Sequence, residues 1–221
     1  MSLSQLRLSQ LEFGALLTYA PHGSSAEAQR SKDVMYLLKK DGFIGEPQIL
    51  MSEWIAKRIQ EKMTELPFAS FFGSNTILVP APKSSLMQPY TLWVPERIAA
   101  AFVRRGIGKG VSSCLVRATA VPKAAYCAPQ NRPTAVDHYA SICVQGGLVE
   151  PDEILLIDDV VTRGATLIGA ANRLADAFPK THIRAFAAMR TISDENEFQK
   201  IYDPCVGKID LWATGETYRR P

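Results

Sequence analysis

The sequence lacks the features of membrane-spanning, secreted and zinc-binding proteins. It contains no apolar run of the ~20 residues that a membrane helix needs, and its first twenty residues lack the basic-then-apolar order of a signal peptide. Its 4 cysteines form no Cys-x-x-Cys pair, and only 3 histidines accompany them. We therefore expect a cytoplasmic protein without a membrane partner, whose free thiols are Cys114, Cys127, Cys143 and Cys205.

A strong charge of either sign is also missing. The formal net charge is +3, the pI is near 8.7, and the basic residues are scattered along the chain. This balance does not require a nucleic-acid partner, and we expect none. With 221 residues, of which 47% are hydrophobic, the chain is long enough to bury the core of one α/β domain.

The most informative stretch runs from Ile154 to Thr166. It begins with four apolar residues, two of them β-branched, which predict a strand buried on both faces that ends at the acidic pair Asp158 and Asp159. A small, hydroxyl-rich loop follows, and apolar residues then recur at helical spacing until Pro179. The predicted order is therefore strand, loop, helix.

A loop that enters a helix in this way suits a phosphate monoester, because it offers unpaired N–H groups, hydroxyls and the positive end of a helix dipole. The two carboxylates before it would repel a phosphate and need hydroxyl groups or a cation as partners, so a ribose 5-phosphate satisfies both halves. The candidate phosphate-binding residues are Thr162, Arg163, Gly164, Ala165 and Thr166. Two alternatives stay open. The acidic pair can instead form a turn and a helix N-cap, and Arg163 can point to solvent instead of bonding the phosphate.

The segment after the predicted strand Thr76–Val79 is a second candidate loop. Its prolines stiffen the turn, and a lysine and two hydroxyls follow, so it can bind a second phosphate group. A cis peptide bond before Pro80 or Pro82 would expose backbone N–H groups to a ligand. The candidate residues are Ala81, Pro82, Lys83 as the point charge, and Ser84. The alternative is an ordinary exposed turn.

Residues 117–141 lose the periodic pattern of helices and strands. A compact domain rarely contains ~20 irregular residues unless they form a lid or a binding loop. Lys123 and Arg132 are the candidate ligand-contacting residues of this segment. We expect His138 to be a packed or exposed histidine and not a catalyst.

The rest of the pattern completes a single domain over residues 1–221. Helices are predicted over 26–40, 47–66 and 95–105, and strands over 111–116, 182–189 and near 209–212, whereas residues 1–24 carry few periodic signals. The expected parts are an N-terminal helical hood over about 1–70, an α/β core over about 72–191 and a C-terminal extension over 192–221.

The stretch from Ile154 to Thr166 resembles, without a gap, the signature of type I phosphoribosyltransferases: an apolar strand, two acidic residues, two apolar residues and Thr-x-Gly-x-Thr. The resemblance implies a mostly parallel central sheet with helices on both faces and a small N-terminal hood. It also implies that Asp158 and Asp159 hold the ribose hydroxyls of phosphoribosyl pyrophosphate, while residues 162–166 wrap its 5-phosphate. The loop at 81–84 would take the pyrophosphate, residues 117–141 would close over it, and Mg²⁺ would reach the acidic pair through the ligand.

The wider layout is most similar to the competence-protein ComF family. Besides the acidic motif, the resemblance rests on Leu37–Lys39, Val79–Pro82 and Ala187–Arg190. Two features depart from that family: its amino-terminal zinc-binding cysteines are missing, and Ser84–Thr91 replaces its arginine-rich stretch. These departures argue against a competence role.

The predicted function is a glycosyltransferase reaction, in which a phosphoribosyltransferase uses phosphoribosyl pyrophosphate and Mg²⁺ on an unknown acceptor. Thr162 stands where the purine-salvage transferases carry an acidic residue that handles the base proton, which disfavours a 6-oxopurine acceptor. Two alternatives are a sensor that binds the same ligand without turning it over, and a ComF-like DNA-uptake accessory protein, which would need a concentrated basic face. A homodimer stays open as a further partner hypothesis.

Overall fold

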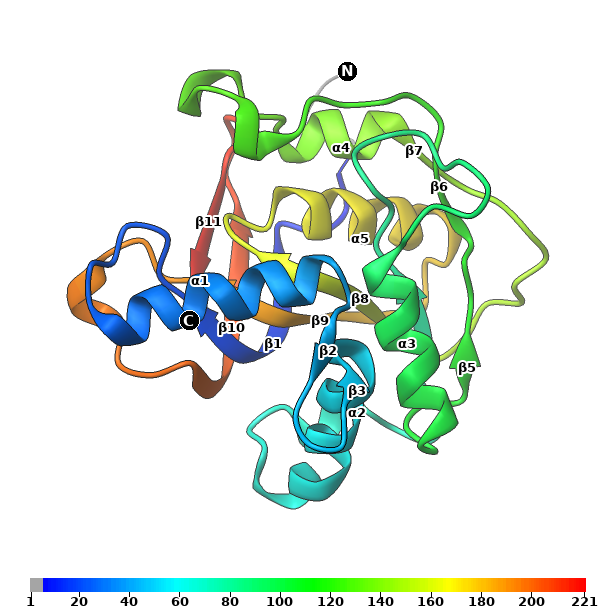
Figure 1. The fold of residues 1–221 in the computed structure, drawn as a ribbon. Coiled ribbons are helices and arrows are strands. Elements are labelled where there is room, and N and C mark those ends of the chain that lie inside the picture. Colours follow the sequence, from blue (N-terminus) through cyan, green and yellow to red (C-terminus); the bar gives the residue numbers. More distant parts are fainter. Residues whose placement is uncertain (1–5) are drawn as a thin grey trace.

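The protein, described by a computed structural model over residues 6–221, is built around one large sheet (Figure 1). The strands are β1 (Gln10–Tyr19), β2 (Phe43–Ile44), β3 (Ile49–Leu50), β4 (Ile77–Pro80), β5 (Gly110–Val111), β6 (Leu115–Arg117), β7 (Ile142–Val144), β8 (Glu153–Val161), β9 (His182–Thr191), β10 (Tyr202–Leu211) and β11 (Thr217–Arg220). The helices are α1 (Ala26–Lys39), α2 (Met51–Lys62), α3 (Val94–Arg104), α4 (Ala135–Ser141) and α5 (Ala165–Ala177). Short 3-10 helices lie at Met63–Glu65, Ala69–Phe71, Ala124–Tyr126, Pro129–Asn131 and Glu195–Glu197.

The large sheet has 7 strands in the order β11-β10-β1-β9-β8-β4-β5. Strands β1, β9, β8, β4 and β5 are parallel, whereas β10 and β11 add an antiparallel hairpin beside β1. The chain passes from β4 to β5 on one side and later to β8 on the other, so the winding changes direction between β4 and β8. Ligands of open α/β sheets bind outside the carboxyl ends of the strands at such a switch point. The topology therefore predicts a ligand site at the edge beside Pro80 and Ile157, which are register partners.

Helices cover both faces of the sheet, which explains the continuous apolar run in β8. Ile154 and Leu156 belong to a core that also contains residues of α4 and α5. Leu155 and Ile157 belong to a second core, shared with α1, α2 and α3. All four side chains are buried. The predicted α/β class, with a mostly parallel central sheet and helices on both faces, is confirmed.

Several predicted elements are also confirmed, namely α1, α3, α5, β4 and β9. Ser25 caps α1, because its hydroxyl accepts a hydrogen bond from the N–H of Ala28 at 3.1 Å. Strand β1 lies outside the predicted elements, although it is an interior strand of the sheet between β9 and β10. The apolar residues Leu11, Phe13 and Leu16 are the signal that could have identified it.

Three predicted boundaries are wrong. Strand β8 does not end at the acidic pair, because its pairing with β9 continues to Val161. The strand expected over 111–116 is divided between β5, in the large sheet, and β6, which pairs with β7 in a separate two-stranded sheet. The helix expected over 47–66 is shorter, because Ile49 and Leu50 pair with β2 before α2 begins.

The cis peptide bond considered for the second candidate loop is absent at both of its prolines. A cis peptide bond precedes Pro47, whereas the bonds that precede Pro80 and Pro82 are trans. The segment at 117–141 is less irregular than expected, because it contains the whole of α4. Thr134 and Asp137 form a capping box that begins this helix.

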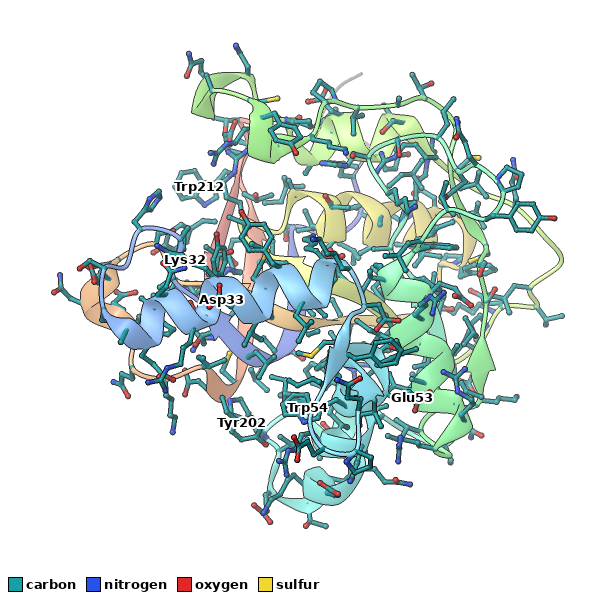
Figure 2. The ribbon with its side chains drawn as sticks, in the orientation of Figure 1. Lys32, Asp33, Glu53, Trp54, Tyr202 and Trp212 are labelled. Atoms are coloured by element: carbon teal, nitrogen blue, oxygen red, sulfur yellow. The ribbon has the colours of Figure 1, made fainter. Side chains whose placement is uncertain are left out.

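Two tryptophans lie toward the outside of the fold (Figure 2). Trp54 of α2 packs against the second core, and the guanidinium of Arg58 lies over its ring at 5.5 Å from the centroid. Trp212, just after β10, stacks on Tyr218 with the ring centroids 5.9 Å apart. Within residues 6–221, no helix combines the length and the apolar character needed to cross a membrane.

Candidate ligand-binding site at the carboxyl edge of the sheet

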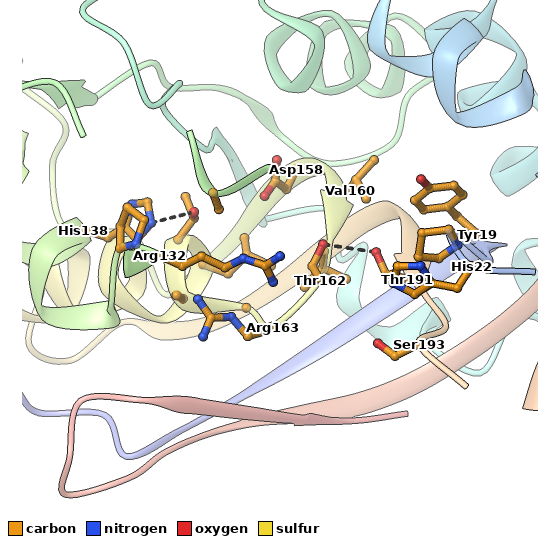
Figure 3. Close-up of a pocket in the computed structure, with 18 residues that line it drawn as sticks. Tyr19, His22, Arg132, His138, Asp158, Val160, Thr162, Arg163, Thr191 and Ser193 are labelled. Atoms are coloured by element: carbon orange, nitrogen blue, oxygen red, sulfur yellow. Dashed lines mark hydrogen bonds between the residues drawn. The ribbon is translucent and has the colours of Figure 1, made fainter. Parts of the chain in front are cut away.

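A cavity of about 390 Å³ lies at the carboxyl ends of β1, β8 and β9 (Figure 3). Asp158 and the loop Thr162–Thr166 line its middle, and Arg132 and His138 line one end. Tyr19, His22 and Ser193 are among the residues at the other end. The cavity therefore brings together residues from segments that are far apart in the sequence, at the edge where the parallel strands end.

The two adjacent carboxylates have different surroundings because they belong to a strand. Side chains alternate between the faces of a strand, so Asp158 and Asp159 point in opposite directions. Asp158 lines the cavity together with Val160 and Thr162, whereas Asp159 does not. Asp159 instead accepts a hydrogen bond from the ammonium of Lys39 at 2.8 Å and one from the N–H of Val160 at 2.7 Å.

Burial, followed by the charge of Asp159, raises the pKa of Asp158. Burial of the ammonium alone would lower the pKa of Lys39, but the charges of Asp159 and Asp158 and the hydrogen bond to Asp159 together raise it. The acidic pair is neither a turn nor a helix cap, because α5 begins after Gly164. Lys39 belongs to the segment that supported the ComF resemblance, but its pattern gave no sign that it would reach Asp159 across 120 positions.

The loop Thr162–Thr166 joins β8 to α5 and faces the cavity. Gly164 has a φ of 86°, a left-handed conformation that favours glycine, and it is the N-cap of α5 without a capping side chain. The first N–H groups of the helix therefore remain directed beyond its end. A Cβ at this position would lie 2.6 Å from Cδ1 of Ile209. The turn is thus fixed both by its backbone conformation and by its contact with β10.

The C-terminal hairpin, formed by β10 and β11, supports this loop. Arg163 lines the cavity and forms an ion pair with Glu216 at 3.0 Å, so it does not point freely into solvent. Arg219 donates a hydrogen bond from Nε to the carbonyl of Thr162 at 2.7 Å. Neither Glu216 nor Arg219 carried a local sequence signal for this role, because their position depends on how the hairpin joins the sheet.

The second candidate loop does not contribute side chains to the cavity. None of Ala81, Pro82, Lys83 and Ser84 lines it. Ala81 and Pro82 are buried, and the N–H of Ala81 donates to the carbonyl of Ile157 at 2.8 Å, so this segment is not an ordinary exposed turn. Burial, followed by the charge of Lys123, lowers the pKa of Lys83. The two lysines are therefore close enough to repel each other.

The two candidate lid residues lie in different places. Arg132 lines the cavity, and its Nε donates to the carbonyl of Cys127 at 3.4 Å. Lys123 does not line the cavity, and its ammonium lies 5.9 Å from the ring centroid of Tyr126. The structure therefore brings one of the two predicted lid cations to the cavity.

His138 is a site residue that the sequence reasoning undervalued. It is only 5% exposed and it lines the cavity. Its Nε2 lies 3.2 Å from the hydroxyl of Thr166, and its Nδ1 lies 3.3 Å from Nη2 of Arg117. Burial, followed by the charge of Arg117, lowers its pKa to about 4. His138 is thus packed, as expected, but it is packed against the candidate phosphate loop.

The residues described here do not build a metal site of their own. Within residues 6–221, no group of three or more histidine, cysteine or acidic side chains is arranged to hold an ion. Asp158 is nevertheless a carboxylate that lines the cavity. Mg²⁺ commonly binds through one or two carboxylates together with ligand phosphates and water, so this donor set fits an ion that arrives with a phosphorylated ligand.

Comparison with known proteins leaves the family open. No protein-family model matches the chain, and no curated protein matches it. A similar solved structure is that of a hypoxanthine phosphoribosyltransferase from Staphylococcus aureus, with a TM-score of 0.37 and 12% identity over 65% of this chain and 73% of that chain. A likeness at this level transfers neither residues nor an activity. The resemblance to the ComF family therefore stays a prediction.

Proposed function

We propose that the protein binds phosphoribosyl pyrophosphate and transfers its phosphoribosyl group to an acceptor, as a Mg²⁺-dependent phosphoribosyltransferase. The observation that carries this proposal is the shared lining of one cavity by the carboxylate of Asp158 and by the loop Thr162–Thr166. The first suits hydroxyl groups, and the second, at a helix N-terminus, suits a phosphate. A pentose 5-phosphate presents both groups on one molecule.

In this proposal, the 5-phosphate lies against the N-terminus of α5 and the hydroxyls of Thr162 and Thr166. Arg163 and Arg132 line the same cavity and add positive charge near the phosphate. Asp158 holds the ribose hydroxyls, while Asp159 has a supporting role because it is bonded to Lys39. The acidic pair is thus divided between one residue that contacts the ligand and one that anchors the strand end to α1.

Asp158 would also contribute to the chemical step. Departure of pyrophosphate leaves positive charge on C1 of the ribose, and a carboxylate held near the ring stabilises that charge. Mg²⁺ bound with the ligand would neutralise the leaving pyrophosphate. The segment that contains Arg132 forms one wall of the cavity, where it would limit the access of water to the reacting carbon.

The remaining end of the cavity is the proposed place for the acceptor. Tyr19, His22, Val160 and Ser193 line it, and none of them is a carboxylate or a permanent cation. A neutral acceptor, such as an uncharged heterocycle or amine, would need no counter-charge there. Thr162 cannot take up a base proton as a carboxylate does, so an acceptor that already carries a free lone pair is favoured.

A non-catalytic sensor of the same ligand is the second candidate. It is favoured by the position of the second loop, since Lys83 and Ser84 do not line the cavity and supply no charge to a leaving group there. A protein that only binds the ligand, without releasing pyrophosphate from it, does not need those groups. The two candidates share the binding step and differ in turnover.

Calorimetric titration with phosphoribosyl pyrophosphate, with and without Mg²⁺, tests the shared step, and ribose 5-phosphate is the comparison ligand. We expect both compounds to bind at one site. Pyrophosphate release during a screen of nucleobases and amines then separates the enzyme from the sensor. If neither compound binds at millimolar concentration, both candidates are refuted. If the compounds bind but no acceptor causes release of pyrophosphate, the sensor remains.

A further inference from the structure

A continuous chain of hydrogen bonds joins the two candidate loops behind the wall of the cavity. It runs from the carbonyl of Lys83 to Arg117, from Arg117 to His138, and from His138 to the hydroxyl of Thr166. The donor–acceptor distances along it are 2.8, 3.3 and 3.2 Å. The four residues come from the loop after β4, from β6, from α4 and from α5.

Arg117 is the unusual member of this chain because it is a buried cation. The residue is 2% exposed, and its partners are the carbonyl of Lys83, the hydroxyl of Ser141 and the ring of His138. Among residues 6–221, no carboxylate forms an ion pair with it. A buried charge normally has a charged partner. Arg117 does not line the cavity, so its charge reaches a ligand there only through His138 and Thr166.

The direction of the hydrogen bonds follows from Arg117. A guanidinium has donors and no acceptor, so Nδ1 of His138 must accept. The imidazole is then neutral with its hydrogen on Nε2, which donates to Thr166. Burial and the charges of Arg117 and Arg163 keep the ring neutral, and Asp137 opposes them only in part. Asp137 also accepts a hydrogen bond from the hydroxyl of Thr134 at 2.8 Å in the capping box.

The hydroxyl hydrogen of Thr166 is consequently left for another acceptor. Its oxygen already receives the hydrogen of His138, and it has no further partner within hydrogen-bond distance among residues 6–221. Thr166 lines the cavity at the start of α5. A phosphate oxygen in the cavity is a strong acceptor for such a hydroxyl.

We infer that Arg117 and His138 are positioning residues that direct the hydroxyl of Thr166 at the ligand phosphate and tie that contact to the loop after β4. This inference rests on the proposed function, because it assigns a role toward the same phosphate. Neither residue touches the reacting atoms. His138 acts through Thr166, and Arg117 acts through His138.

The first test is of the histidine alone and requires no ligand. Nitrogen NMR distinguishes the two neutral tautomers of imidazole, and His138→Gln assigns the signal among the 3 histidines of the chain. We expect the tautomer with hydrogen on Nε2 at pH 7. The opposite tautomer, or a protonated ring, would overturn the inference whether or not the protein binds phosphoribosyl pyrophosphate.

The second test is a double-mutant cycle read as affinity for ribose 5-phosphate. Thr166→Val should weaken binding about tenfold, because a hydrogen bond to a charged group is lost. His138→Leu should weaken it about three- to tenfold, and the double variant should match Thr166→Val. Additive losses, or no loss in His138→Leu, would refute the inference while the wild-type titration still upholds the proposed function.

Two further variants separate positioning from a general effect on folding. In His138→Gln, the amide can accept from Arg117 and donate to Thr166, so affinity should return to within about twofold of the wild type. His182→Leu makes the same substitution as His138→Leu at an exposed histidine at the start of β9, outside the cavity lining, and should leave affinity unchanged. If His138→Leu does not fold, the NMR result and the His138→Gln affinity decide the question.

Discussion

Strands β8 and β4 are neighbours in the sheet, but only the loop after β8 lines the cavity. The loop after β8 is held by side chains from two parts of the fold, namely Arg219 and Glu216 of the C-terminal hairpin and His138 of α4. In the loop after β4, the carbonyl of Lys83 accepts from Arg117, while its side chain lies outside the cavity near Lys123.

The difference indicates that the binding groups for the two ends of the proposed ligand are not equally preorganised. A monoester would find helix N–H groups and hydroxyls already in place at the loop after β8. A second phosphate group would instead have to draw Lys83 and Lys123 toward it, although a bound anion would also relieve the repulsion between the two lysines.

The largest expected effect separates the two carboxylates at the end of β8. Asp158→Asn should weaken the binding of phosphoribosyl pyrophosphate about 100-fold, because two hydrogen bonds to a charged group would be lost. The stability of the free protein should not fall, since burial and Asp159 disfavour the charged form of Asp158 until hydroxyl donors and a cation in the cavity stabilise it. Asp159→Asn should weaken binding less than about fivefold, because Asp159 lies outside the cavity. Calorimetric titration and urea unfolding of both variants provide the measurements, and equal losses of affinity would contradict the proposed division.

The second prediction concerns the turn of the loop after β8. Gly164→Ala should lower the free energy of unfolding by about 2–3 kcal/mol, since a left-handed φ is unfavourable and the new Cβ would meet Ile209 at 2.6 Å. Gly106→Ala is the matched control, with a φ of 73° and no atom within 4 Å of the added Cβ. It should cost about 1 kcal/mol. Urea unfolding measures both, and equal costs would show that Ile209 does not restrain the turn.

The third prediction tests the histidine that connects the two loops. Because the pKa of His138 is lowered to about 4, the unfolded chain binds the proton more tightly than the folded protein does. This residue should therefore have almost no effect above about pH 7.5 and should cost about 2 kcal/mol of stability at pH 5. Protonation would also place a hydrogen on Nδ1, where Arg117 donates. Urea unfolding at pH 7.5 and pH 5 should show a smaller difference for His138→Gln than for the wild type.

The contrast between the loops also explains how far the sequence could predict the structure. The strand, loop and helix from Ile154 to Ala177 were predictable because their signals are local: an apolar run, a small and hydroxyl-rich loop, and a helical apolar stripe. The end of the strand was not, because the pairing of β8 with β9 continues past the acidic pair. That extension decides which of the two carboxylates faces the cavity.

The supporting contacts of the site could not be predicted in the same way. Lys39 reaches Asp159 across 120 positions, and Glu216 reaches Arg163 across 53. Such polar residues carry no periodic signature, and their partners are set by the order of the strands. Strand β1 is a different case, since its apolar residues were visible, but Gly14 interrupts them where a Cβ would lie 2.7 Å from Phe68.

The smallest expected effect concerns the loop after β4 and would reveal whether it joins the site when a diphosphate is present. Lys83→Met should weaken the binding of phosphoribosyl pyrophosphate about three- to tenfold and leave the affinity for ribose 5-phosphate within about twofold, because only the first ligand has a group that the lysine could reach. Lys109→Met removes a lysine that is exposed before β5 and should change neither affinity. An equal loss of affinity for both ligands would mean that Lys83 contributes to the electrostatic potential of the whole cavity. No loss for either ligand would mean that the loop after β4 stays outside the site, which would favour the sensor over the transferase.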